Sequence, residues 1–237
     1  MIDFDQLVDL VISERDYGIY KRTPFMHKSR IYFTFKKIFN KGSYNGLSIA
    51  DIGCNEGTYS VLFKGKGFSV DGLDICDLNK AKQLSSKYNL DVKYYSMPIE
   101  SPELSKTYDY IFCSEVLEHV DDINKALISI KKLSHKSTKI IISLPNVISL
   151  YGILRLIRDM VVNKFDFSKV DPHQKFPPWR VIKLFNRHGF KIKVLGSVNF
   201  TPFNIYPKLN LIFGDFSIFK VLGYSTFYYA NKKYRTI

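Results

Sequence analysis

Carboxylates and glycines stand close together where an apolar run ends, in the stretch IADIGCNEGTYSVLF at residues 49–63. Asp51, Gly53 and Gly57 lie at this turn, and Asp74 ends the next apolar run. Glycines between a strand and a helix let the backbone approach a nucleotide closely. The spacing G-x-x-x-G differs from the G-x-G-x-x-G of a dinucleotide site, and the carboxylates would repel phosphates. These residues favour a nucleoside without phosphates that carries a positive amino group, with Asp74 accepting hydrogen bonds from its ribose.

Two histidines are candidates for proton transfer. His119 follows the apolar run 108–113, and His173 lies further on in the stretch VDPHQKF. Because imidazole titrates near neutral pH, either side chain could be a general base, and each could equally have a structural role. Glu115 and Glu118 could join His119 in holding a divalent ion, but carboxylates here can also line a cofactor site, and we expect no metal.

Strand-like and helix-like runs alternate along the chain, which predicts an α/β fold with a parallel sheet covered on both faces. Pro178 and Gly189 mark the start and the stop of a late helix. The predicted strands cover 47–52, 68–75, 91–96, 108–113, 139–144, 190–198 and 224–230, and the predicted helices cover 58–65, 77–88, 122–134 and 178–189.

Length and composition place the chain among globular proteins. Its 237 residues, 46% of them hydrophobic, can bury one sizeable core. Three scattered cysteines are too few for a disulfide framework and fit a reducing compartment. The acidic N-terminus does not resemble a secretory signal, and no apolar run reaches the roughly eighteen residues of a membrane span. We therefore expect a cytoplasmic location.

The net charge of +13 is unevenly distributed along the chain. It amounts to −3 over residues 1–13, +6 over 14–41, −1 over 42–150 and +11 over 151–237. The basic surplus therefore flanks the nucleoside-like motif. A surplus of this kind either solvates the surface or attracts an anionic substrate, a nucleic acid or a membrane.

Residues 147–162 (VISLYGILRLIRDMVV) form an apolar helical run that only Arg155, Arg158 and Asp159 interrupt. Such a run is either buried as a cap over a pocket or in contact with lipid, and we prefer burial. Together with the basic flanks it favours an anionic amphiphilic acceptor, such as a lipid-linked intermediate, and a peripheral contact with the membrane face.

In four motifs that follow one another along the chain, the sequence resembles the S-adenosylmethionine-dependent methyltransferases of the seven-stranded Rossmann-like type. The matching motifs are DIGCNEG at 51–57, LDI at 73–75 and YDYIFCSEVLEHVDD at 108–122. The segment DPHQKFPPWRVIKLFNRHGFKIK at 171–193 is similar to the small-molecule branch that includes quinone-biosynthesis methyltransferases. The resemblance covers roughly residues 45–200.

The resemblance implies a three-layer Rossmann-like fold with a mostly parallel seven-stranded sheet and helices on both faces. It places the whole chain, 1–237, in a single methyltransferase domain. The expected parts are an N-terminal helical cap at 1–44, a cofactor-binding half at 45–145, an inserted helical acceptor-pocket region at 146–189 and C-terminal strands at 190–237.

The resemblance also implies S-adenosylmethionine as the cofactor. The turn residues would line its methionine end, the acid after the second strand would bind the ribose, and the next residue would pack on the adenine. An acid commonly follows the third strand near the adenine amine, but Met97 and Pro98 stand there, with Glu100 as a displaced substitute. The implied cofactor contacts are Asp51, Gly53, Asn55, Gly57, Asp74, Ile75, Met97, Pro98, Ser114 and Glu115.

The function that we expect from the resemblance is methylation of a hydroxyl on a small molecule, such as a sugar, a lipid-linked or a quinone-like acceptor. Two rivals stay open. The basic surplus favours an RNA methyltransferase, although a base-methylating NPPY-type motif is missing after the fourth strand. The missing acid near the adenine favours a catalytically silent cofactor-binding protein.

Overall fold

The computed structural model describes residues 4–14, 24–40, 42–162, 164, 176–199 and 222–233. The chain forms two compact units. Unit 1 comprises Met1–Pro24, Lys41–Ser114 and Asp122–Ile141, and unit 2 comprises Phe25–Asn40, Glu115–Asp121 and Ile142–Ile237.

The strands form one seven-stranded sheet in the order β3-β2-β1-β4-β5-β7-β6. The pairs β1–β2, β1–β4 and β2–β3 are parallel, whereas β6 pairs with β7 in antiparallel fashion from Phe190↔Lys232 to Val198↔Ser225. The predicted seven-stranded sheet is confirmed, and the structure adds that it is mixed. The antiparallel pair comes from two consecutive strands, which need no crossover helix between them.

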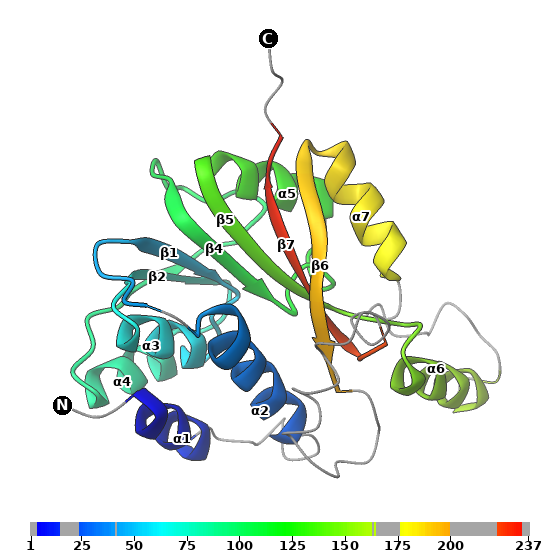
Figure 1. The fold of residues 1–237 in the computed structure, drawn as a ribbon, viewed down its shortest axis with the longest axis horizontal. Helices are drawn as coiled ribbons and strands as arrows, with labels where there is room; N and C mark the ends of the chain where they lie inside the picture. Colours follow the sequence, from blue (N-terminus) through cyan, green and yellow to red (C-terminus); the bar gives the residue numbers. More distant parts are fainter. Residues whose placement is uncertain are drawn as a thin grey trace. The chain divides into compact units, whose positions relative to one another are not determined.

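Unit 1 contains the first four strands and the helices that connect them (Figure 1). The strand order reverses between β1 and β4, and in α/β sheets ligands bind at the carboxyl ends of the strands beside such a reversal. Its elements are α1 (Phe4–Glu14), β1 (Ser48–Ile52), α3 (Thr58–Gly65), β2 (Ser69–Asp74), α4 (Asn79–Lys87), β3 (Lys93–Ser96), β4 (Tyr108–Ser114), α5 (Ile123–Lys132) and the first part of β5 (Ser134–Pro145).

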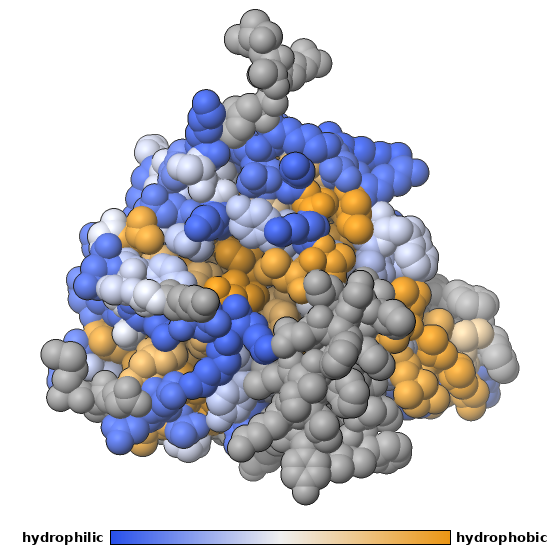
Figure 2. Space-filling view, in the orientation of Figure 1, coloured by the Kyte–Doolittle hydropathy of each residue, from blue (hydrophilic) through white to orange (hydrophobic). Residues whose placement is uncertain are grey.

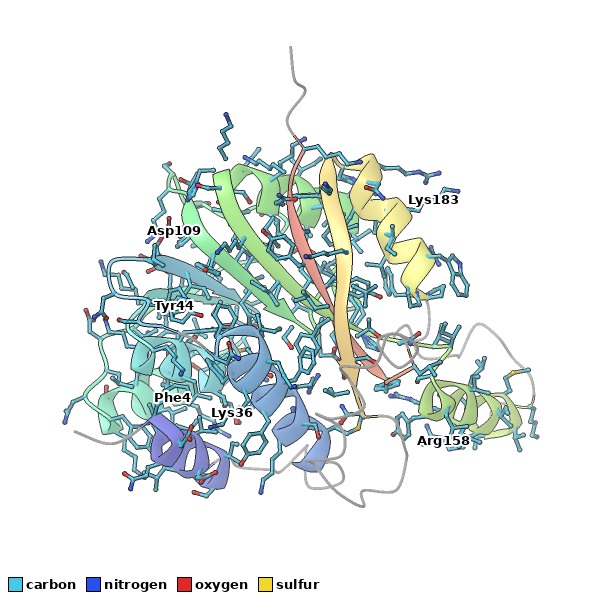
Figure 3. The ribbon with its side chains drawn as sticks, in the orientation of Figure 1. Phe4, Lys36, Tyr44, Asp109, Arg158 and Lys183 are labelled. Carbon is cyan, nitrogen blue, oxygen red and sulfur yellow. The ribbon has the colours of Figure 1, made fainter. Side chains whose placement is uncertain are left out.

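Hydrogen bonds between Ser48 and Asp109 hold the starts of β1 and β4 of unit 1 in register. The Asp109 carboxylate, labelled in Figure 3, accepts hydrogen bonds from the backbone N–H of Ser48 at 2.8 Å and from its hydroxyl at 2.7 Å. Further along, the ring of Phe63 on α3 packs edge to face against Phe112 of β4, with centroids 5.1 Å apart. The hydrogen bonds fix the start of both strands, and the ring contact packs α3 against the sheet.

Among the described residues, unit 2 contains the last part of β5, the antiparallel pair, three α-helices and one π-helix. The late helix begins at Pro178 as predicted and ends at Arg187, just before Gly189 with its positive φ of 80°. Phe185 and Phe190 pack this helix against the following strand with ring centroids 5.7 Å apart. The elements are α2 (Pro24–Phe33), the π-helix η2 (Thr34–Ile38), α6 (Leu150–Val162), α7 (Pro178–Arg187), β6 (Phe190–Val198) and β7 (Ser225–Lys232).

The helix α6 of unit 2 turns its apolar face outward, so the preference for burial of this run is wrong for that face. Figure 2 shows an orange surface over α6, and its exposed large side chains are Leu150, Ile153, Leu154, Ile157, Val161 and Val162. The buried positions are Gly152 and Asp159. A Cβ at Gly152 would lie 2.5 Å from the Asn146 carbonyl oxygen, so only glycine lets the helix approach that backbone.

Candidate functional site

The glycine turn follows β1 in unit 1 and bends back over the end of β2. The backbone N–H of Gly53 donates to the Leu73 carbonyl at 2.7 Å, and Gly53, Asn55 and Gly57 have φ values of 73°, 46° and 80°. A Cβ at Gly57 would lie 2.7 Å from the Tyr94 hydroxyl oxygen, so glycine is required there by both conformation and space. The predicted turn residues therefore lie together at the end of β1.

Asp74 ends β2 and is held by the glycine turn. Its Oδ2 accepts the backbone N–H of Asn55 at 2.8 Å, and its Oδ1 accepts the backbone N–H of Cys76 at 3.1 Å. A carboxylate has about four acceptor positions, so each oxygen keeps capacity for a further hydrogen bond. The two N–H donors fix the plane of the carboxylate before any ligand binds, which prepares it for a pair of neighbouring hydroxyls.

Asp51 lies within β1 and is almost completely buried. The Ser60 hydroxyl on α3 donates to its Oδ2 at 2.6 Å. Burial raises the pKa of this carboxyl from 3.8 to about 7, and the hydrogen bond from Ser60 opposes part of that rise. The group therefore titrates near neutral pH, and a cation brought close to it would favour its ionised form.

An apolar rim adjoins Asp74. Ile75 is 74% exposed, which is unusual for a large aliphatic side chain and suits a flat apolar ligand surface. The backbone N–H of Met97 donates to the Asp74 carbonyl at 2.9 Å, and Pro98 beside it is exposed. Glu100 lies further along, where its carbonyl accepts the Ser129 hydroxyl at 3.1 Å, and its role as a displaced adenine contact stays a prediction.

Ser114 is half-buried at the end of β4 in unit 1, and Glu115 begins the next turn in unit 2. The Glu115 carboxylate accepts the Ser143 hydroxyl at 2.9 Å and forms an ion pair with Arg30, with 2.9 Å between Oε2 and Nη1. The prediction that Glu115 contacts the cofactor stays a prediction, and the structure shows which protein groups hold its carboxylate.

His119, the first predicted base, belongs to the same turn. Its side chain is 52% exposed, and its Nε2 lies 4.0 Å from Oε1 of Glu118, whose side chain is fully buried. Among the described residues, no group of three His, Cys, Asp or Glu side chains is arranged to hold a metal ion. The second predicted base, His173, lies outside the residues that the structure describes.

Two residues of these sites were missed in the sequence. Ser60 is a buried hydroxyl in a helix that is otherwise largely apolar on that side, and this contrast is a signal that could have pointed to a polar partner in the sheet. Arg30 gives no comparable signal, because the helix α2 also carries Lys28, and only the folded structure shows which of the two cations lies beside Glu115.

Residues 28–194 of the chain match the protein family described as Methyltransferase domain. The chain is 30% identical over 132 residues to a ubiquinone biosynthesis O-methyltransferase of Rickettsia bellii (strain OSU 85-389), covering 53% of each chain, so it spans about half the length of that relative. It is 25% identical over 233 residues to the protein of that name from Rickettsia typhi (strain ATCC VR-144 / Wilmington), covering 94% of this chain and 87% of the relative.

Solved structures share the fold. A magnesium protoporphyrin IX methyltransferase from Synechocystis PCC 6803 with bound SAH is similar with a TM-score of 0.66 and 18% identity, over 95% of this chain and 94% of that one. A possible histamine N-methyltransferase from Thermotoga maritima is similar with a TM-score of 0.61 and 16% identity, over 94% and 99% of the two chains. These similarities extend over nearly the whole chain.

Proposed function

We propose that this chain, which belongs to the methyltransferase domain family, transfers the methyl group of S-adenosylmethionine to a hydroxyl of a small, quinone-like or lipid-linked acceptor. The observation that carries the proposal is the preorganised carboxylate of Asp74, with one backbone N–H on each oxygen and capacity left on both. A nucleoside with two adjacent hydroxyls and no phosphates satisfies that arrangement.

The remaining residues of the turn also fit this cofactor. Asp51 is a buried carboxyl with a pKa of about 7, and it can ionise when a positive amino group approaches. Ile75 offers an exposed apolar surface beside Asp74 for a purine ring. When bound, the cofactor supplies a methyl group on a positively charged sulfur, which makes the methyl carbon electrophilic. The chain has to hold the acceptor oxygen in line and remove its proton.

His119 is the proposed general base. Imidazole has a suitable intrinsic basicity at neutral pH, and the His119 side chain is 52% exposed. The buried carboxylate of Glu118 lies close enough to stabilise the ring in its protonated form. In the sequence His119 follows Ser114, the last residue of β4, by five positions.

The acceptor class is supported by two observations. The Rickettsia relatives carry the name of a ubiquinone biosynthesis O-methyltransferase, which favours a hydroxyl on a lipophilic ring. Independently, α6 presents apolar side chains outward and keeps its one acidic residue, Asp159, buried. On its inner side Arg155 donates from Nη1 to the Tyr224 hydroxyl at 2.9 Å. A helix whose apolar side chains face outward while its acidic side chain is buried favours contact with lipid.

The charges around α6 suit an anionic membrane surface. Arg158, labelled in Figure 3, forms an ion pair with Asp159 but keeps 65% of its side chain exposed, and Lys164 just beyond the helix is exposed as well. With 13 residues the helix is about 20 Å long, which fits a helix that lies in the interface. None of the described helices is both long and apolar enough to span a membrane. We therefore propose a cytoplasmic enzyme with peripheral membrane contact.

Vesicle sedimentation tests the membrane part. We expect the protein to sediment with vesicles that contain phosphatidylglycerol at low salt, and to do so less with added salt. The double variant Ile153→Ser with Ile157→Ser and the variant Arg158→Glu should each weaken sedimentation at least fivefold. Ile128→Ser on α5, which replaces another exposed isoleucine, is the matched control and should bind like the unmodified protein. Unchanged binding by the α6 variants would exclude this contact.

A second candidate, methylation of RNA, is favoured by the charges of α7, β6 and β7. The segments 176–199 and 222–233 contain seven Lys and Arg residues and no Asp or Glu. Lys183, labelled in Figure 3, is exposed on α7. Cations on one helix and the adjoining strands are a recognised electrostatic footprint of nucleic-acid binding.

A transfer assay with radiolabelled S-adenosylmethionine distinguishes the candidates. The probes are 3,4-dihydroxybenzoate, a short-chain ubiquinol analogue with a free ring hydroxyl, and total RNA. We expect label on the ring hydroxyls and none on RNA, and loss of transfer in Asp74→Ala but not in Asp91→Ala, an exposed carboxylate of the same unit. Label on RNA alone would favour the second candidate, and cofactor binding without any transfer would favour a silent binding protein.

A further inference from the structure

Glu115 has a backbone conformation that its side chain does not favour. Its φ is 56°, in the left-handed region, which costs a residue with a Cβ on the order of 1 kcal/mol. Asparagine tolerates this region better than glutamate. Among the described residues other than glycine, those with positive φ are Asn55, Asn89, Glu115, Lys164 and Asn199.

The surrounding residues of unit 2 hold Glu115 in this conformation. Its backbone N–H donates to the Ser143 carbonyl at 3.0 Å, and the Ser143 hydroxyl donates to its Oε1 at 2.9 Å. Arg30 Nη1 lies 2.9 Å from Oε2, and the two side chains of this ion pair are only 11% and 15% exposed. A charge-assisted hydrogen bond that is shielded from water is stronger than a neutral one, so the pair can offset the backbone strain.

His27 orients the guanidinium. Its Nδ1 lies 2.6 Å from Nη2 of Arg30, and both residues lie on one face of α2, three positions apart. Because a guanidinium has only donors, His27 Nδ1 must be the acceptor in this contact. Arg30 is thus directed by a neighbour on its own helix toward the strained residue Glu115.

The turn that Glu115 begins is the one that presents His119. The backbone N–H of His119 donates to the Val116 carbonyl at 2.8 Å, which closes the turn within a few residues of Glu115. We infer that Arg30 is a positioning residue for methyl transfer, which holds Glu115 in its left-handed conformation and thereby sets the place of His119. This inference rests on the proposed function, because it assumes that His119 is the base.

The test compares Arg30→Met, Arg30→Lys and Glu115→Gln with the matched control Lys28→Met, an exposed cation on the same helix. Hydrogen exchange of the Glu115 and His119 amides and the NMR signal of the His119 ring, assigned with His119→Gln, report the turn without any turnover. In Arg30→Met we expect exchange at both amides to be at least tenfold faster and the ring signal to shift. Arg30→Lys should restore part of the protection, and Lys28→Met should match the unmodified protein.

Binding and kinetics separate positioning from other roles. Calorimetry with S-adenosylhomocysteine should give affinities within threefold of the unmodified protein for Arg30→Met. With a probe hydroxyl that is methylated, kcat should fall at least tenfold and KM should change little, and Glu115→Gln added to Arg30→Met should cause no further loss. If no probe is methylated, the proposed function fails while the exchange data still judge the role of Arg30.

Three results would overturn the inference. Unchanged exchange at Glu115 and His119 in Arg30→Met would show that the ion pair does not hold the turn. A loss of S-adenosylhomocysteine affinity above tenfold in Arg30→Met but not in Glu115→Gln would assign Arg30 to ligand binding instead. If Arg30→Met does not fold, Arg30→Lys takes its place in the test. Amide exchange rates and kinetic constants of Arg30→Lys that equal those of Lys28→Met would then overturn the inference.

Discussion

Replacing Asp51 with asparagine should stabilise the folded protein at neutral pH and weaken cofactor binding at the same time. Asp51 is buried, and burial raises its pKa from 3.8 to about 7 against the lowering effect of the Ser60 hydrogen bond. One pKa unit corresponds to about 1.4 kcal/mol, so a rise of about three units corresponds to a cost on the order of 4 kcal/mol when the carboxyl is ionised. Asparagine keeps an acceptor for Ser60 without that cost.

The sign of the pH dependence follows from the raised pKa. Between about pH 4 and 7 the unfolded chain loses the Asp51 proton while the folded protein keeps it, so the folded state loses stability as the pH rises through this window. Below the window the carboxyl is neutral in both states. The stability gained by Asp51→Asn should therefore be close to zero near pH 4 and reach roughly 2–4 kcal/mol above pH 7.

Urea unfolding between pH 4 and 8 measures this difference. Asp91→Asn, which neutralises an exposed carboxylate of unit 1, is the control and should change the free energy of unfolding by less than about 0.5 kcal/mol at every pH. Two results would refute the near-neutral pKa of this buried carboxyl. One is an equal difference in free energy of unfolding between Asp51→Asn and the unmodified protein at pH 4 and pH 8, and the other is an Asp51→Asn protein that is less stable than the unmodified protein at pH 8.

Binding should show the opposite effect. A cationic amino group that ionises Asp51 makes S-adenosylhomocysteine binding release a proton at pH 6–7, which calorimetry in buffers of different ionisation enthalpy detects. Asp51→Asn should bind this ligand at least tenfold more weakly and release no proton. Tight binding by the variant with unchanged proton release would place the cation away from Asp51.

The remaining predictions concern single side chains of the candidate site. Asp74→Ala should weaken S-adenosylhomocysteine binding by about 1–3 kcal/mol in calorimetry, and equal affinity with an intact fold would contradict the ribose assignment. His119→Ala should keep that affinity while lowering turnover by about 10²-fold, and equal turnover would return His119 to a structural role. Gly57→Ala should lower the free energy of urea unfolding by at least about 1 kcal/mol, because alanine meets both the positive φ and the Tyr94 hydroxyl, and neutral stability would show that the turn can move.

The fold class and the cofactor turn could be predicted because their signals are local. Alternating apolar runs predict the strands and helices, and Gly53 and Gly57 mark a turn that needs positive φ. The helix from Pro178 to Arg187 was predicted almost to its ends from a proline and a glycine. The sequence did not predict that β6 and β7 are antiparallel, because the relative direction of two strands depends on which strands pair and not on the residues of either strand.

The orientation of α6 illustrates a different limit. Apolar residues almost encircle this helix in the sequence, so periodicity alone could not decide which side is buried. The decision comes from the backbone of Asn146, which leaves room only for Gly152 and so fixes the inner side of the helix. The outward apolar face follows from that packing.

The sequence by itself determined which chemical groups are present at the strand ends: Asp51, Asp74 and the glycines between them, since residue type and spacing depend only on the chain. Only the tertiary structure decided what those groups can do. Burial in the sheet raises the pKa of Asp51 to about 7. The backbone N–H of Asn55, in the turn after β1, holds the carboxylate of Asp74 at the end of β2. Arg30 reaches Glu115 from a helix far away in the sequence. Desolvation and hydrogen-bond geometry depend on neighbours that folding brings together, and local sequence does not contain them.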